Sequence, residues 1–128
     1  METNDVKKIV YIEDDADMID LVRLVLGQRQ FNLIGATTGK QGLDIMVQDP
    51  PDLVLLDIML PDMGGWAVYQ QIKQDPLLQD IPVIAVTAQN APIDRILGEH
   101  IAKVQAYVTK PFSPKELRVI VNEVLNLT

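Results

Sequence analysis

The sequence predicts an α/β protein built on a doubly wound sheet of five parallel strands, with helices on both faces. Five short apolar runs alternate along the chain with five longer segments of helical character, the pattern of a parallel sheet joined by crossover helices. One run, at 53–56, is apolar at every position, as in a strand buried on both faces. Right-handed crossovers then restrict the chain to the doubly wound topology.

Strands are predicted where short apolar runs are bounded by turn-forming residues. They span residues 9–12, 31–36, 53–56, 82–86 and 106–108. Pro82 stands at the first position of its strand, where a proline is tolerated. In a doubly wound sheet ligands bind outside the carboxyl ends of the strands, so chemistry is expected from the residues that follow each strand.

Helices are predicted from apolar residues at helical spacing and from end signals. They span residues 15 to about 29, 39–48, 65–74, 92–103 and a last segment that opens at 113. Asp15 is expected to cap the first helix. The last helix opens on Ser113 as its N-cap, Pro114 at the first helical position and Glu116 at the capping-box position.

Length and composition exclude several classes of protein. With 128 residues we expect one domain over 1–128, its core running from about 7 to 127. The chain has no cysteine, which excludes disulfides, thiolate metal sites and a cysteine nucleophile. Its net charge of −7 argues against direct nucleic-acid binding. No apolar run approaches the roughly 18 residues of a membrane helix, and the N-terminus METNDVKK is polar, so we expect a cytoplasmic protein without membrane contact.

Chemically active side chains follow four of the predicted strands. They are Glu13, Asp14, Asp57, Thr87 and Lys110. Clustered carboxylates repel one another unless a cation joins them, and oxygen ligands of this kind suit Mg²⁺. An aspartate can attack phosphorus and form an aspartyl phosphate, and a lysine, a threonine hydroxyl and Mg²⁺ can stabilise the phosphoryl oxygens. The set is complete for a magnesium-assisted phosphorylation of an aspartate.

The chain resembles the receiver domain of bacterial two-component response regulators. The resemblance covers essentially the whole chain and rests on four segments in order, IEDD at 12–15, LLDIMLPDMGG at 55–65, AVTA at 85–88 and YVTKPF at 107–112. It implies a flavodoxin-like sheet with strand order 2-1-3-4-5. It also implies that Asp57 accepts a phosphoryl group from a histidine kinase. Mg²⁺, or Mn²⁺ in its place, would be held by Glu13, Asp14, Asp57 and the backbone carbonyl of Met59.

The same resemblance implies which residues detect the phosphoryl group. Thr87 and Lys110 would contact its oxygens, and Tyr107 would be a switch aromatic that turns inward when Thr87 moves toward the phosphate. The bond between Lys110 and Pro111 is expected to be cis. The domain would catalyse only its own phosphorylation and dephosphorylation, and would not otherwise be an enzyme.

The implied partners are a sensor histidine kinase or phosphotransfer protein and a downstream protein or output domain. The downstream partner would dock on the face formed by the fourth helix, the fifth strand and the fifth helix, which carries charges of both signs. A homodimer through the same face is a further option. The sequence leaves open whether the chain is a stand-alone receiver, a phosphorelay intermediate or a domain of a larger regulator.

The sequence departs from the family pattern at four positions. Glu13 stands where the family more often has Asp, and its longer arm suggests a metal contact through water. Gly64 replaces the usual Asp before Gly65, which is expected to weaken the cap of the third helix. Lys103 and Val104 replace a common Gly-Ala step before the fifth strand.

The same residues argue against two alternative functions. A phosphatase of the haloacid dehalogenase type needs a second Asp two residues after its nucleophile, but Met59 occupies that position. A flavodoxin-like FMN site needs a phosphate-binding loop after the first strand, but that loop is acidic here. Both are therefore disfavoured.

Overall fold

Five parallel strands form one sheet in the order β2-β1-β3-β4-β5. The computed structural model describes residues 6–27, 29–60, 62–88 and 104–127. Its strands are β1 (Lys7–Ile12), β2 (Phe31–Ala36), β3 (Leu53–Asp57), β4 (Val83–Ala88) and β5 (Ala106–Lys110). The predicted fold class and strand order are confirmed.

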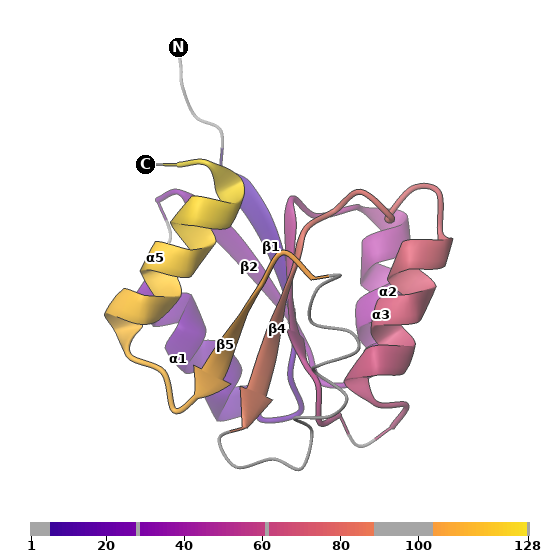
Figure 1. Cartoon of the computed structure of the whole chain (residues 1–128), viewed down its shortest axis with the longest axis horizontal. Coiled ribbons are helices and arrows are strands. Elements are labelled where there is room, and N and C mark those ends of the chain that lie inside the picture. The colour runs from indigo at the N-terminus through magenta and orange to yellow at the C-terminus, as the bar shows by residue number, and fades with distance from the viewer. Residues whose placement is uncertain (1–5, 28, 61, 89–103, 128) are drawn as a thin grey trace.

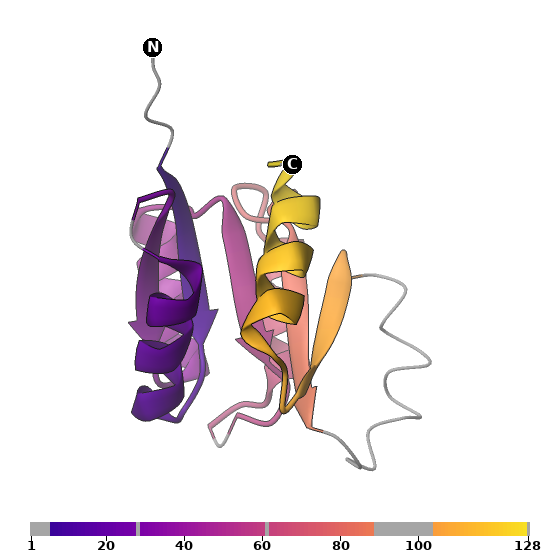
Figure 2. The same ribbon diagram turned by 90° about the vertical axis from the view of Figure 1, so that its left-hand side faces the viewer.

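Helices cover both faces of the sheet. The helices α1 (Ala16–Leu26) and α5 (Pro114–Leu125) lie on one face, and α2 (Gly39–Gln48) and α3 (Gly65–Gln74) on the other (Figure 1). The turned view shows α1 and α5 side by side in front of the strands (Figure 2). The helix predicted at 92–103 falls outside the described residues. Within the described ranges, no helix has the length and apolarity needed to cross a membrane.

The strands are buried because both faces are covered. All five residues of β3 are buried, as the unbroken apolar run predicts. Successive side chains point to opposite faces, so Ile9 packs in the cluster under α1 and α5 while Val10 packs in the cluster under α2 and α3. Each fully buried aliphatic side chain contributes about 1.5–3 kcal/mol to folding. The two cores hold the strand ends in fixed positions.

Helix boundaries follow local chemistry. Asp15 caps α1 by accepting from the backbone N–H groups of Asp17 and Met18, as predicted. The helix ends at Leu26, earlier than the predicted end near 29, because Gly27 adopts φ +79° and leaves the helical conformation.

The start of α5 matches its prediction closely. The Ser113 hydroxyl accepts from the N–H of Glu116, and the Glu116 carboxylate accepts from the N–H of Ser113. This reciprocal capping box, with Pro114 in the first turn, sets where the helix begins.

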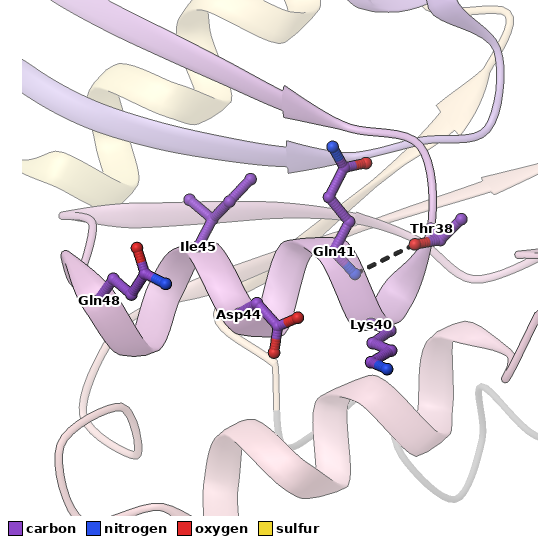
Figure 3. A pocket seen from close by; sticks show the side chains of 6 residues that line it. All are labelled: Thr38, Lys40, Gln41, Asp44, Ile45 and Gln48. Atoms are coloured by element: carbon purple, nitrogen blue, oxygen red, sulfur yellow. Dashed lines mark hydrogen bonds between the residues drawn. The ribbon is translucent and has the colours of Figure 1, made fainter.

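A shallow hollow of about 330 Å³ lies along α2 (Figure 3). The Thr38 hydroxyl caps the helix by accepting from the N–H of Gln41. The six side chains that line the hollow all belong to α2 or to this cap, and are those of Thr38, Lys40, Gln41, Asp44, Ile45 and Gln48. None of the chemically active residues that follow the strands borders it, so it is separate from the candidate site.

Candidate functional site

The carboxyl ends of β1, β3, β4 and β5 place the predicted residues at one edge of the sheet. Glu13 follows β1 directly, and Asp57 is the last residue of β3. Thr87 lies near the end of β4, and Lys110 is the last residue of β5. Three of the four belong to strands and Glu13 directly follows one, so the buried strands set where these side chains lie.

Three carboxylates meet at this edge. Glu13, Asp14 and Asp57 each offer one oxygen, and these three oxygens lie within 4.8 Å of one another. Glu13 is only 1% exposed and Asp57 5%, whereas Asp14 is open to solvent. An all-oxygen set with one solvent-facing member fits Mg²⁺ or Mn²⁺, which keep part of their water shell. The residues present therefore fit the metal that the sequence predicts.

The pKa of Asp14 reflects the crowding of carboxylates at this edge. Its pKa is raised, chiefly because its carboxyl shares a hydrogen bond with Glu13 and because it is partly desolvated. A raised carboxyl pKa means that the ionised form is disfavoured in this setting. A divalent cation at the cluster would remove that penalty.

Among the residues that the structure describes, Lys110 supplies positive charge at this edge. Its Nζ lies 2.5 Å from Glu13 Oε1 and 3.5 Å from Asp57 Oδ2, so one ammonium joins two acids that come from different strands. Burial works to lower the pKa of Lys110, but the hydrogen bond to Glu13 and the charge of Asp57 outweigh it and raise that pKa. The lysine is therefore charged at neutral pH and points at the candidate phosphoacceptor.

The backbone also orients Asp57. Its Oδ1 accepts a hydrogen bond from the N–H of Met59 at 2.9 Å, while Oδ2 faces Lys110. The Met59 side chain is 57% exposed and turns away from the core. The carboxylate thus has its two oxygens in different surroundings, one on the loop and one beside the ammonium.

The loop after β3 is tied to neighbouring elements. The Asp62 carboxylate accepts from the N–H groups of Gly39 and Lys40 at the start of α2. The hydrogen bond from Gly39 is the main reason why the pKa of Asp62 is lowered.

Gly64, at φ +77°, gives α3 no side-chain cap, as expected from the replacement of the usual Asp at this position.

The predicted switch pair lies on neighbouring strands. Thr87 is 3% exposed on β4, and its register partner on β5 is Thr109. Tyr107 on β5 is 49% exposed, so its ring faces outward in this conformation. The Lys110–Pro111 peptide bond is cis, as expected. A change of Tyr107 between outward and inward positions remains a prediction.

Part of the predicted docking face is described. A groove of about 270 Å³ runs between β5 and α5 and is lined by Gln105, Ala106, Ile120, Glu123 and Val124. The fourth helix, which would complete the face, lies outside the described residues, as does Lys103. Val104, the other member of that departure, packs against Ile58 and Ala85.

One residue of the site was missed by the sequence reasoning. Tyr11, the last residue but one of β1, is fully buried, and its hydroxyl donates to Glu13 Oε1 at 2.9 Å. Burial, together with the adjacent Glu13, raises the pKa of Tyr11, so its hydroxyl stays protonated. Residues two apart on a strand share a face, and that spacing was the available signal.

Comparison with known proteins gives a consistent match. The family model described as the response regulator receiver domain matches residues 9–122. A protein of Guillardia theta named "Probable transcriptional regulator ycf27" is 35% identical over 122 residues, which are 95% of this chain and 46% of that protein. The chain spans about half the length of the curated relatives that it matches.

Solved structures of response regulators have a similar fold. A CheY-like receiver domain protein of Methanospirillum hungatei is 26% identical, with a TM-score of 0.82 and coverage of 94% of both chains. The Mn²⁺-bound form of the response regulator Rcp1 is 28% identical, with a TM-score of 0.79 and coverage of 95% of this chain and 96% of that one.

Proposed function

Because the chain belongs to the family of response regulator receiver domains, we propose that it is a phosphorylation-controlled switch whose phosphoacceptor is Asp57. The observation that carries the proposal is the placing of Asp57, buried at the end of β3 between the Lys110 ammonium and an acidic pair. We extend the proposal to the whole of 1–128 as one receiver unit.

The phosphoryl donor would be a sensor histidine kinase or a phosphotransfer protein. A carboxylate oxygen of Asp57 attacks the phosphorus, the bond from phosphorus to the donor breaks, and the donor leaves with that electron pair. Lys110 lies 3.5 Å from Oδ2 and can neutralise charge that gathers on the phosphoryl oxygens. The domain speeds only this transfer and the later hydrolysis of its own acyl phosphate.

Mg²⁺, or Mn²⁺ in its place, would be held by Glu13, Asp14, Asp57 and the backbone carbonyl of Met59. The ion would supply positive charge to the phosphoryl oxygens during transfer. Two observations support this assignment, namely the close oxygens of the three carboxylates and the Mn²⁺-bound relative.

The output would be a change of surface. Thr87 would move toward the new phosphoryl oxygens, and Tyr107 would turn from its half-exposed position into the space that Thr87 leaves. Only contacts that differ between the two states can shift such an equilibrium. The face of β5 and α5, with the segment before β5, would then bind a downstream protein, an output domain or a second copy. We propose no direct contact with nucleic acid or membrane and a cytoplasmic location.

The two alternatives from the sequence find no support at this edge. Met59, two residues after Asp57, has an apolar side chain that can donate no proton. The loop after β1 contributes Glu13 and Asp14 to the carboxylate cluster, whose negative charge would repel the phosphate of FMN.

A stable phosphoryl mimic tests the switch. Beryllofluoride with Mg²⁺ should shift the amide NMR signals of 57–59 and of 106–110 in the wild-type chain. Thr87→Ala should keep the shifts at 57–59 but lose those at Tyr107, whereas Thr109→Ala, altered at the register partner on β5, should keep both. A wild-type spectrum that the mimic leaves unchanged would contradict the proposed function.

A further inference from the structure

The Glu13 carboxylate is held by donors from three segments. Its Oε1 accepts from the Tyr11 hydroxyl at 2.9 Å and from Lys110 Nζ at 2.5 Å, and its Oε2 lies 3.3 Å from the N–H of Asp15. We propose that Tyr11 is a positioning residue that fixes this carboxylate for the cation, and that it makes the site require Glu rather than Asp at position 13. The inference rests on the proposed metal site.

The ring of Tyr11 cannot follow a moving partner. Tyr11 is 0% exposed and packs in the core between the sheet and the helices α1 and α5. Interiors are packed as densely as crystals, so the hydroxyl has a fixed place. A hydroxyl buried there needs a partner, and Glu13 supplies it.

The length of the side chain at position 13 decides whether the contact exists. Asp is shorter than Glu by one methylene, which draws the carboxylate back by about 1.5 Å. A separation of 2.9 Å would then pass beyond hydrogen-bond range. The tyrosine and the glutamate therefore act as a matched pair at the end of β1.

The contact also decides which oxygen is available to the cation. Two donors occupy Oε1, whereas Oε2 accepts the long contact from the N–H of Asp15. A carboxylate oxygen accepts about two hydrogen bonds, so Oε2 keeps acceptor capacity for the ion or for a water bound to it. Loss of the Tyr11 hydroxyl would leave Lys110 as the donor on Oε1, and the carboxylate could then turn about that single contact.

A double-mutant cycle tests the pair through Mg²⁺ affinity, measured by isothermal titration calorimetry without any phosphoryl donor. Tyr11→Phe and Glu13→Asp should each raise the Mg²⁺ Kd by about tenfold, the usual effect of losing a group that orients a metal ligand. The double variant should also be weakened by only about tenfold, because the shorter Asp no longer reaches the hydroxyl. Tyr69→Phe, which removes the hydroxyl of a buried tyrosine in the core cluster on the opposite face of the sheet, should leave the Kd unchanged.

Three outcomes separate the claims. A Tyr11→Phe chain that is folded by circular dichroism and binds Mg²⁺ as wild type would overturn the inference. A double variant whose Mg²⁺ Kd is raised by about a hundredfold would also overturn it, because the two substitutions would then act independently. Wild-type protein that binds no Mg²⁺ would contradict the proposed function itself. Urea unfolding in EDTA of wild type, the two single variants and the double variant gives a second cycle. In it the losses in the free energy of unfolding should again be non-additive.

Discussion

Replacing Lys110 with alanine should slow phosphoryl transfer to Asp57 by about a hundredfold or more, the scale of losing one preorganised charge at a transition state. Its ammonium lies 3.5 Å from Asp57 Oδ2 and is the cation that the described site itself supplies. The initial rate of adduct formation at saturating Mg²⁺ measures the effect. Lys73→Ala is the matched control, because Lys73 is a partly buried lysine that bonds to backbone carbonyls of Gln79 and Ile81 instead. Equal rates in wild type and Lys110→Ala would refute this role.

The same substitution should change two other quantities. Without Lys110 the buried Glu13 carboxylate loses its counter-charge, so the free energy of unfolding in EDTA should fall by roughly 1–3 kcal/mol, less than for a fully buried pair because the lysine is partly exposed. Mg²⁺ should bind about tenfold more tightly, because a competing positive charge has gone. Slower transfer with tighter metal binding would separate the role of Lys110 from that of a metal ligand.

Replacing Gly65 with alanine should lower the free energy of unfolding by about 2–3 kcal/mol, the usual cost of overpacking. A Cβ there would lie 2.5 Å from the backbone oxygen of Asp57 and 2.5 Å from the Cα of Ile58. Backbone atoms at the end of a buried strand cannot move aside cheaply, so Asp57 itself would be displaced. Phosphoryl transfer should slow by on the order of a hundredfold, as for other displacements of a reacting group by about 1 Å. Urea unfolding and the rate of adduct formation measure the two effects.

Gly42→Ala is the control for this substitution. It also adds a methyl group at a buried helical glycine, but there the nearest atoms belong to the Ile12 side chain and not to the backbone, so that side chain and not the strand would have to shift. A gain in helix propensity of up to about 1 kcal/mol works against the crowding. We expect a small change in stability and an unchanged rate of transfer. A Gly65→Ala variant that matched this control in both measurements would show that α3 does not position Asp57.

The fold was largely predictable because its local signals agree with one another. The unbroken apolar run of β3 and the capping box at Ser113 each specify an element without reference to the rest of the chain. Element ends were less predictable. The end of α1 depends on the backbone conformation of Gly27, and β5 extends to Lys110 because its residues pair with β4 as far as Ala88. Such extensions depend on neighbouring strands, which a local pattern does not contain.

The sequence predicted which residues form the candidate site, but not the contacts between their side chains. The positions of Glu13, Asp57 and Lys110 after apolar runs indicate that they meet at one edge, and the structure brings them together. The contact from Tyr11 was not foreseen, because an aromatic residue in a strand usually serves packing alone. The hydrogen bond from its hydroxyl can be inferred only once the reach of the Glu13 side chain and the burial of both side chains are known.

Mass spectrometry of the intact chain tests the central claim, phosphorylation of Asp57, most directly. Wild type and Asp57→Asn should be incubated with acetyl phosphate in the presence of Mg²⁺ and again after chelation. We expect a single alkali-labile phosphoryl adduct on wild type with Mg²⁺, and none on Asp57→Asn or on the chelated protein. An adduct of the same yield on folded Asp57→Asn would contradict the account, because it would place the phosphoryl group on another residue.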